Sequence, residues 1–421
     1  MAKKFKVGLL GCGSVGRGLV ELIGRNHDVI RQRSGVELSI TRILVRDAAK
    51  ERPGVDRDLI TTSAEKVINN GCDMVVELVG GIEPARSLIE GSLEQKKHVV
   101  TANKALLAVD GFRLLQAAES QNVRLGFEAS VCGGIPIIRA LRNGLVGNQI
   151  QSLAGILNGT CNYILTRMTE DRAEFGDALS EAQQKGFAEA DPSLDIDGHD
   201  AAQKLKILAE LAFNAQITAE AVSTEGIRNL TAEDVRAARD LGLVIKHVAT
   251  AELNGDSICL QARPVLLPSS HQLAGVREEN NAVLVRGDAV GDMMFSGKGA
   301  GPLPSASAVL SDIVDIACHQ GGFSATHDRT LDVHSPQQNC QHYLRVPVNH
   351  PSAIGPITAV LERHGIGIAR ASAVWAKNAE SEHQVQVFTH AVASQALRNC
   401  LPDIGALGVP GDAQVLLPVL T

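Results

Sequence analysis

The 421-residue chain is poor in aromatic side chains, which make up only 3% of it and include a single tryptophan. It has no run of basic residues, and its formal net charge is −7. Nucleic-acid surfaces need cationic patches and stacking rings, so both shortages argue against a nucleic-acid partner. No apolar stretch reaches membrane-spanning length, and the opening MAKKFKVGLLGCG is typical of a strand rather than a signal peptide.

The eight cysteines are scattered and include no Cys-x-x-Cys pair. This pattern predicts neither a zinc site nor a disulfide framework, and it favours a reducing, cytoplasmic setting. A hydrophobic content of 44% with 21% charged residues is typical of a globular protein. The length allows two or three domains.

Strands and helices alternate through the first 130 residues, which predicts an α/β fold with a Rossmann-like parallel sheet. The strand at Lys4–Leu10 leads into a helix that we expect to run to about Arg33. Between them stands G-x-G-x-x-G, whose glycines allow a tight turn, approach of a pyrophosphate and close helix packing. A merely tight turn is the alternative. The predicted dinucleotide contacts are Gly11, Gly13, Ser14, Val15 and Gly16.

Two cationic residues follow later strands of this sheet. Arg46 comes after the strand at Glu37–Val45, where an arginine suits the 2′-phosphate of NADP. NAD stays open, and a solvated loop arginine is the alternative. Lys104 comes just after the strand at His98–Thr101, at the edge where ligands bind in such sheets, and it is either a ligand contact or a helix-capping residue.

A predicted helix at Asp200–Phe213 carries two lysines in different positions. At 100° per residue, Lys204 falls in the middle of the apolar face, with Asp200 one turn before it. Lys206 and Glu210 fall on the opposite face, where we expect them to be solvated. A buried lysine needs a partner and its pKa is easily lowered, so Lys204 is a candidate proton donor or acceptor. A structural Asp–Lys pair is the alternative.

Acidic residues crowd the stretch before and at the start of this helix. Repulsion among them suggests that they bind a cationic or polar group. They are Glu189, Asp191, Asp195, Asp197 and Asp200.

A further acidic residue, Glu128, begins a glycine-rich stretch that ends at Pro136. A carboxylate with free backbone carbonyls suits a hard cation, although a domain-crossing loop is the default interpretation. Cys132 and Cys161 have no local base, so we expect buried thiols rather than nucleophiles.

The chain divides into four predicted parts. They are a dinucleotide-binding domain (1–135), an α+β substrate and dimerisation domain (136–320), a polar linker (321–340) and a ferredoxin-like domain (341–421). The last helix of the second part, at about 305–318, is expected to pack back on the first domain. The final part follows the order β-α-β-β-α-β. Uncovered edges of the middle antiparallel sheet predict a homodimer or homotetramer.

Seven stretches together resemble the homoserine dehydrogenase family over the whole chain. The first six are GCGSVG, TANKALLA at Thr101–Ala108, FEASVCGGIP at Phe127–Pro136, GILNGTCNYIL at Gly155–Leu165, GFAEADPSLDIDGHDAAQKLKILA at Gly186–Ala209, and SGKGAGPLPSASAVLSD at Ser296–Asp312. The seventh, HPSAIGPITAVLERHGIGIARASAV, resembles an ACT domain, an amino-acid-sensing module.

The resemblance implies interconversion of homoserine and aspartate 4-semialdehyde with NADP or NAD, in threonine, methionine and isoleucine biosynthesis. Lys204 is then the proton donor, with Lys104 beside it as a second catalytic residue near cofactor and substrate. The substrate contacts implied are Glu189, Asp195 and Asp200. Further cofactor contacts are Gly186, Glu189 and Gly301, and a sodium site is implied at Glu128, Val131, Gly133 and Ile135.

The tail implies feedback control by threonine, and we expect the effector to bind at Asn349–Gly355. Two other functions remain open. One is a reductase for another amino-acid-derived aldehyde or imine, and the other is a non-catalytic amino acid sensor. An aldehyde-oxidising enzyme would need a nucleophilic cysteine with a base, so Cys132→Ser and Cys161→Ser should be harmless.

Overall fold

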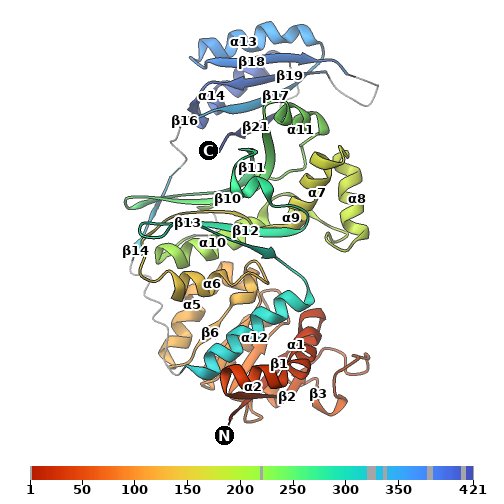
Figure 1. The fold of residues 1–421 in the computed structure, drawn as a ribbon, viewed down its shortest axis with the longest axis vertical. Coiled ribbons are helices and arrows are strands. Elements are labelled where there is room, and N and C mark those ends of the chain that lie inside the picture. Colours follow the sequence, from red (N-terminus) through yellow and green to blue (C-terminus); the bar gives the residue numbers. More distant parts are fainter. Residues whose placement is uncertain are drawn as a thin grey trace.

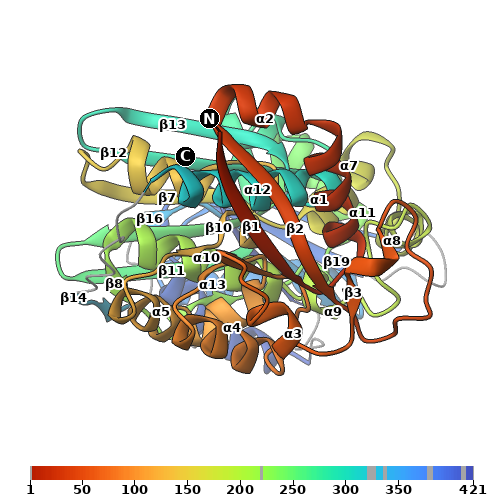
Figure 2. The same cartoon turned by 90° about the horizontal axis from the view of Figure 1, so that it is seen from below.

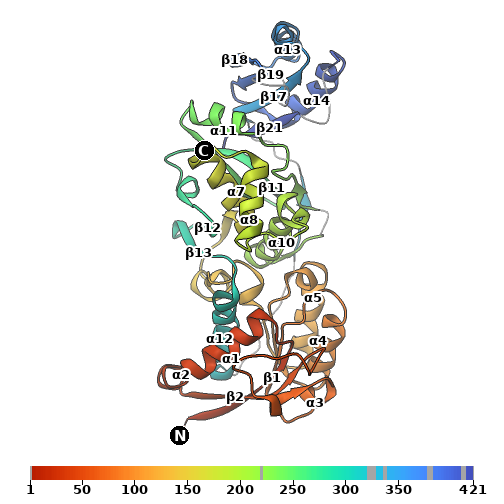
Figure 3. The ribbon, with the colours of Figure 1, turned by 90° about the vertical axis from the view of Figure 1, so that its right-hand side faces the viewer.

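The computed structural model describes residues 2–218, 221–319, 329–334, 339–376, 383–408 and 414–420. They form three tiers along one long axis, with the N-terminus in the bottom tier (Figures 1 and 3). The chain ends beside the joint between the middle and top tiers (Figure 1). Among the residues described, no helix has the length and apolar character needed to cross a membrane.

The bottom tier is a six-stranded parallel sheet in the order β3-β2-β1-β4-β5-β6. This is the strand order of dinucleotide-binding folds, so the predicted Rossmann-like sheet is confirmed. Val7, Leu9, Met74 and Val76 are fully buried because helices cover both faces. The strands are β1 (Lys3–Leu10), β2 (Val36–Leu44), β3 (Ile60–Thr61), β4 (Met74–Glu77), β5 (His98–Thr101) and β6 (Leu125–Gly126).

One helix on this sheet comes from late in the sequence. Figure 2 shows α12 (Pro302–Cys318) beside α1 on one face, with α3, α4 and α5 on the other. Gly18 allows this packing, because a Cβ there would lie 3.0 Å from the Pro302 carbonyl oxygen. The other helices are α1 (Ser14–Arg25), α2 (His27–Ser34), α3 (Glu65–Ile68), α4 (Ala85–Glu94) and α5 (Lys104–Ser120). The expected single helix to Arg33 is wrong, since Asn26 interrupts it with φ −107° and ψ 18°.

The middle tier is a mainly antiparallel sheet in the order β13-β12-β7-β10-β11-β15, with β9 beside β11. The edge strand β13 was not predicted, because its exposed residues show no alternation and its glycine-rich end suggested a loop. The strands are β7 (Ile150–Ile156), β9 (Ser223–Thr224), β10 (Leu243–Asn254), β11 (Ser257–Pro268), β12 (Asn280–Gly287), β13 (Gly291–Lys298) and β15 (Asp332–Val333). Of the expected linker at 321–340, residues 321–328 and 335–338 lie outside the described residues.

Helices flank this sheet. The sequence at Ile137–Leu145 predicts one helix, whereas the structure has a short α-helix followed by a π-helical turn at Ala140–Gly144. Two further helices, α9 and α11, were not predicted. The helices are α6 (Ile137–Arg139), α7 (Gly159–Glu170), α8 (Phe175–Gln184), α9 (Ser193–Ile196), α10 (His199–Phe213) and α11 (Ala232–Arg239).

The helix α10 is packed on two sides, and this corrects one prediction. A single hydrophobic cluster joins α4 and α5 of the bottom tier to α10 and to the middle sheet. Lys206 was expected to be solvated, but it is 6% exposed and its Nζ lies 2.6 Å from Oε1 of Glu210, which is 7% exposed. Helical periodicity marks the face that meets one neighbour, whereas α10 has neighbours on both sides.

The top tier is a four-stranded antiparallel sheet in the order β18-β19-β17-β21, with two helices. Its elements follow the predicted β-α-β-β-α-β order, which confirms a ferredoxin-like arrangement. They are β17 (His342–Val348), α13 (Ile354–Arg363), β18 (Ile368–Val374), β19 (His383–Thr389), α14 (Ser394–Gly405) and β21 (Val415–Pro418). Ala413, expected to start the last strand, lies outside the described residues.

Buried polar contacts join the top tier to the middle one. Asp234 of α11 accepts a hydrogen bond of 2.6 Å from the Tyr343 hydroxyl and pairs with Arg345 at 3.0 Å. Arg263 of β11 donates to the Leu416 carbonyl at 2.8 Å. Because these groups are buried, leaving any one of them unpaired would cost more than at the surface.

Replacing Glu210 by alanine leaves the Lys206 ammonium buried without its counter-ion. We expect this variant to lose about 3–5 kcal/mol of stability, seen as a lower Tm by calorimetry. The double variant Lys206→Met, Glu210→Met removes both charges and should recover most of the loss. A double variant no more stable than Glu210→Ala would contradict a buried pair.

Candidate functional site

The glycine-rich loop between β1 and α1 has the shape of a phosphate cradle. Gly11 has φ +98°, and a Cβ there would lie 2.6 Å from the Leu78 carbonyl oxygen. A Cβ on Gly16 would lie 2.8 Å from the Gly11 oxygen, whereas one on Gly13 would meet nothing within 4 Å. Two glycines therefore shape the turn, and the third leaves open space before the α1 N-terminus, where an anion is stabilised. Ser14 and Val15 begin that helix.

The carboxyl ends of β4 and β5 are tied together by a buried glutamate that the sequence analysis did not single out. Glu77 accepts hydrogen bonds from the Val79 and Gly80 amides and from the Thr101 hydroxyl at 2.6 Å. Thr101 in turn accepts from the Asn103 amide. Asn103 caps α5 by accepting from the Leu106 amide, and this places Lys104 as the first residue of the helix.

Asp200 connects two lysines from different tiers. One carboxylate oxygen, Oδ1, pairs with Nζ of Lys104, and Oδ2 lies 2.8 Å from Nζ of Lys204. Lys204 also donates to the Leu157 carbonyl at 2.7 Å. Asp200 is 2% exposed and Lys204 8%, so this is a nearly buried centre where α5, α10 and the end of β7 meet. The third N–H of Lys204 has no partner among the described residues.

Burial and the neighbouring charges shift the pKa values of this centre in opposite directions. Burial alone would raise the pKa of Asp200, but the two lysines outweigh it and lower that pKa. Burial would lower the pKa of Lys204, but the Asp200 carboxylate outweighs it and raises the pKa. The expected lowered pKa of Lys204 is therefore wrong in this state. The ammonium holds its proton and is arranged to give it rather than take it.

Asp195 joins the same centre through an asparagine and a threonine. Asn158 donates through Nδ2 to Asp195 and to Asp200, at 2.7 Å each. The Thr160 hydroxyl lies 3.1 Å from Asp195 and 2.7 Å from the Phe187 carbonyl. Burial, with the Asp200 charge adding to it, raises the pKa of Asp195. Two carboxylates are thus held side by side.

The remaining acidic residues of the cluster lie elsewhere. Asp197 makes a two-pronged ion pair with Arg228, at 2.9 Å for each oxygen. Glu189 is exposed after α8, and its carboxylate has no contact with the lysines. The structure therefore brings together Asp195, Asp200, Lys104 and Lys204, and leaves Glu189 outside their hydrogen-bonded network.

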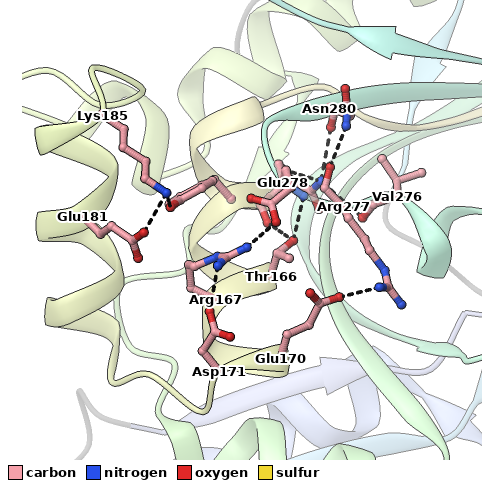
Figure 4. Close-up of polar contacts among 12 residues, drawn as sticks. Thr166, Arg167, Glu170, Asp171, Glu181, Lys185, Val276, Arg277, Glu278 and Asn280 are labelled. Carbon is pink, nitrogen blue, oxygen red and sulfur yellow. Dashed lines mark hydrogen bonds and ion pairs between the residues drawn. The ribbon is translucent and has the colours of Figure 1, made fainter.

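The loop that carries Gly186 and Glu189 is anchored at both ends. Lys185 lies 2.8 Å from the Tyr163 hydroxyl and from Glu181, and Gln183 donates to the Glu189 carbonyl. Figure 4 shows Lys185 at the edge of a charged network that also joins α7 to the turn at 276–280. In that network Arg167 pairs with Asp171 and Glu278, and Arg277 pairs with Glu170.

Two glycine-rich segments meet near this centre. Gly301 precedes α12 with φ +120°, and a Cβ on Gly133 would lie 2.7 Å from the Gly299 oxygen. Glu128 is 2% exposed and accepts the Ile138 and Arg139 amides at 2.8 Å each. Burial, strengthened by nearby Asp312, raises the pKa of Glu128 to about 7.

The structure also places Arg46, Cys132 and Cys161, three other residues considered in the sequence. Arg46 is exposed after β2, with no contact to another described side chain. Cys132 and Cys161 are buried, as expected, and burial raises the pKa of both thiols. Neither thiol is therefore prepared to act as a nucleophile.

A cavity of about 360 Å³ lies between α5, α10 and the π-helical turn. Leu107, Leu115, Leu141, Ile207 and Leu211 are among its lining residues, and none of the charged centre's residues is. Size and apolar lining usually mark a ligand site. The charged centre, where several titratable side chains meet, is instead the candidate site for proton transfer.

Sequence reasoning missed the residues that hold the centre in place. Asn158 lies in the stretch Gly155–Leu165 that carries the family resemblance, but its own role was not predicted, although an asparagine between a strand and a helix is a capping signal. It caps α7 by accepting from the Cys161 amide. Glu77 and Thr101 carried no distinguishing pattern, because a lone polar residue in an apolar strand does not reveal its partner.

Two family models that match this chain identify the class of protein. Residues 11–128 match the model described as "Homoserine dehydrogenase, NAD binding domain", and residues 136–314 match "Homoserine dehydrogenase". The chain therefore carries the two family domains of a nicotinamide-dependent dehydrogenase.

Similarity to individual proteins extends over the full length. The homoserine dehydrogenase of Synechocystis is 40% identical, over 99% of this chain and 99% of the relative. The crystal structure of a homoserine dehydrogenase from Thiobacillus denitrificans has a TM-score of 0.90 and 39% identity, over 99% of this chain and 98% of that one. A hyperthermophilic archaeal homoserine dehydrogenase mutant in complex with NADPH has a TM-score of 0.63 and 27% identity, over 74% of this chain and 97% of that one. This chain belongs to the homoserine dehydrogenase family and is an NAD(P)-dependent oxidoreductase.

Replacing Gly13 by alanine should separate cofactor binding from folding. Because a Cβ there meets no protein atom, we expect an unchanged Tm but cofactor binding weaker by about 1–3 kcal/mol. Gly16→Ala is the matched control, since its Cβ meets the Gly11 carbonyl and should lower the Tm. Calorimetry and cofactor titration measure the two effects. Equal cofactor affinity in Gly13→Ala and the parent would contradict a phosphate cradle at this loop.

Proposed function

We propose that Lys204 is the proton donor when aspartate 4-semialdehyde is reduced to homoserine. Its placement beside Asp200, the free third N–H and the raised pKa support this role. A bound nicotinamide supplies the hydride, and the protein supplies the proton and the orientation. As hydride reaches the carbonyl carbon, charge grows on the oxygen, and an ammonium both stabilises and protonates it. In the reverse direction neutral Lys204 takes the hydroxyl proton.

The substrate's own ammonium needs carboxylates. We assign Asp195 and Asp200 to this task because Asn158 holds them side by side. Glu189 is exposed and out of contact in this structure, so its role rests on the family resemblance alone. Lys104 pairs with Asp200 from the cofactor domain, and we assign it to the junction of substrate and cofactor. Gly186 and Gly301 are proposed to border the nicotinamide.

Replacing Lys204 by methionine should lower turnover by about 10²–10⁴-fold, because the proton donor is lost. The matched control is Lys206→Met, Glu210→Met, which removes a second buried lysine from the same helix together with its partner. Turnover is followed through the absorbance of reduced nicotinamide. Parental turnover in Lys204→Met would contradict the assignment.

NADP is the proposed preferred cofactor. Arg46 follows β2 at the carboxyl edge and is exposed without a partner, so it is free to meet a 2′-phosphate. Burial raises the pKa of the Cys12 thiol in the glycine-rich loop, and the charges of nearby Arg52 and Arg17 partly offset this rise. The relative solved with NADPH agrees with this preference.

Arg46→Ala should raise the KM for NADP and leave the KM for NAD unchanged, because only NADP carries the 2′-phosphate. Initial rates with each cofactor measure the effect. Arg57→Ala, which removes an exposed arginine of the same domain, is the control. An equal change in both KM values would argue against phosphate recognition at Arg46.

A monovalent cation is proposed at Glu128. The donor set is one buried carboxylate and the carbonyls of Val131, Gly133 and Ile135, which suits a hard cation. The carbonyls of Val131 and Gly133 accept no hydrogen bond from a described residue, so they are available. No group of three His, Cys, Asp or Glu residues suited to a metal occurs among the described residues, which limits the site to this mixed set. Sodium should raise the Tm of the parent but not of Glu128→Gln, and equal responses would reject the site.

We propose that the top tier is an ACT domain through which threonine inhibits the enzyme. A path of contacts supports this coupling. Arg345 of β17 donates to the Asn229 carbonyl at 2.6 Å, and the Ile227 amide donates to Ile196 at 2.8 Å. Ile196 ends α9, just before the turn to Asp200.

The only tryptophan, Trp375, offers a direct test. Its ring lies 5.5 Å from His350, at the start of the segment Asn349–Gly355. Threonine should change Trp375 fluorescence with saturation and lower turnover over the same concentration range. D-threonine and the Trp375→Phe variant are the controls. Unchanged fluorescence and turnover would remove threonine as the effector.

A homodimer or homotetramer is proposed on the basis of β13. This edge strand of eight residues pairs only with β12 among the described residues, and Met293 and Met294 are exposed. A long, apolar edge strand of a sheet is usually covered by another segment or another chain. A monomer by light scattering would reject the proposal. The biosynthetic pathway and the cytoplasmic setting stay predictions.

A further inference from the structure

The carbonyl that holds Lys204 is shared with a second donor. Leu157 O accepts from Nζ of Lys204 at 2.7 Å and from Nδ2 of Asn281 at 2.9 Å. A carbonyl oxygen has two lone pairs, so these two donors fill it. The Leu157 peptide therefore cannot rotate without losing one of them, and Lys204 has a fixed anchor besides Asp200.

Asn281 lies where three segments of the site meet. It is 1% exposed at the start of β12, and its Nδ2 also lies 3.5 Å from the Cys132 sulfur. A Cβ on Gly299 would lie 2.1–2.3 Å from the Asn281 amide, so only glycine fits there. The amide thus touches the Lys204 anchor, the Cys132 segment and the segment that leads into α12.

The amide has a single suitable orientation. Nδ2 donates to Leu157, and a flipped amide would place Oδ1 against the carbonyl oxygen. Oδ1 is buried and has no hydrogen-bond partner, an arrangement that is uncommon in folded proteins. An alanine or leucine would remove this unsatisfied oxygen, so stability alone does not account for an asparagine here.

The turn that leads into Asn281 is itself held rigidly. Asn162 of α7 donates through Nδ2 to the carbonyls of Val276, Glu278 and Asn280. Lys246 donates to Asn162 Oδ1 at 2.9 Å. The ion pairs of Glu278 and Arg277 in Figure 4 fix the same turn from outside. Asn281 is therefore presented at a defined position.

We propose that Asn281 is a positioning residue for proton transfer, which fixes the Leu157 carbonyl and thereby directs Lys204. This inference rests on the proposed role of Lys204. Loss of the Nδ2 donor frees the carbonyl to rotate, and Lys204 then loses its orientation toward the substrate oxygen. Because substrate binding uses the carboxylates of Asp195 and Asp200, the effect falls on the chemical step.

The test uses the full-length protein and three variants. Asn281→Ala removes the donor, and Asn281→Asp replaces it with an oxygen and a negative charge. Asn280→Ala is the matched control, since that neighbouring side chain is half-buried and, among the described residues, donates only to the Arg277 carbonyl. Each variant is assayed for kcat and KM in both directions, well below its own Tm.

We expect Asn281→Ala to lower kcat by about 10- to 100-fold, the scale of a slightly misplaced catalytic group. The KM for homoserine should stay within about twofold of the parent, and Asn280→Ala should match the parent. In Asn281→Asp the added charge favours the ammonium, so homoserine oxidation, which needs neutral Lys204, should shift to higher pH. The other titratable groups around Lys204 are Asp200, Lys104, Asp195, Cys132 and Cys161, and none is changed.

Two results would overturn the proposal. One is a kcat for Asn281→Ala equal to that of Asn280→Ala. The other is a pH profile of Asn281→Asp identical to the parent's. Lys204→Met in the same assay distinguishes a failure of the role of Asn281 from a failure of the role of Lys204. If it is inactive while Asn281→Ala is fully active, only the role of Asn281 fails, whereas a fully active Lys204→Met removes the proposed role of Lys204.

Discussion

The carboxylate of Asp200 is the interaction on which the site depends. This carboxylate is nearly buried. It accepts hydrogen bonds from Lys104 of the bottom tier, from Lys204 of its own helix and from Asn158. Without it, two ammonium groups would lie close together in a region of low dielectric. Breaking such a buried arrangement is strongly destabilising. The same contact joins two tiers and sets the charge of the centre.

Strand order explains why this contact exists. Parallel strands bring their carboxyl ends to one edge, and the Glu77–Thr101–Asn103 chain of hydrogen bonds fixes the start of α5 there. The helix α10 begins at the same place from the middle tier. Their N-terminal ends therefore meet at Lys104 and Asp200, between the cofactor cradle and the antiparallel sheet. The fold alone therefore places these charged groups at one junction.

Local sequence patterns predicted much of this arrangement. Alternating strands and helices predicted the parallel sheet, and the glycine spacing predicted the cradle. Helical periodicity placed Lys204 inward, and the structure confirms this burial. The same periodicity was wrong for Lys206, because it cannot show that a helix has neighbours on two sides. The family resemblance added roles for Lys104 and Glu189, and the structure brings only Lys104 into the charged centre.

Residues that act through a distant partner could not be found from sequence alone. Asn158 and Asn281 are more than 100 positions apart, and each gains its meaning from a contact formed by folding. Nor does a local pattern say which way a pKa shifts. Burial alone lowers that of Lys204, and the nearby Asp200 carboxylate reverses the direction.

The most direct test is the protonation of Lys204 itself. Competitive acetylation read by mass spectrometry gives the pKa of each lysine in the parent and in Asp200→Asn. The account predicts a pKa for Lys204 above 10.5, the ordinary value, in the parent. It predicts a pKa below that value in Asp200→Asn, where burial dominates. A Lys204 pKa that is already low in the parent, or unmoved by Asp200→Asn, would contradict the account.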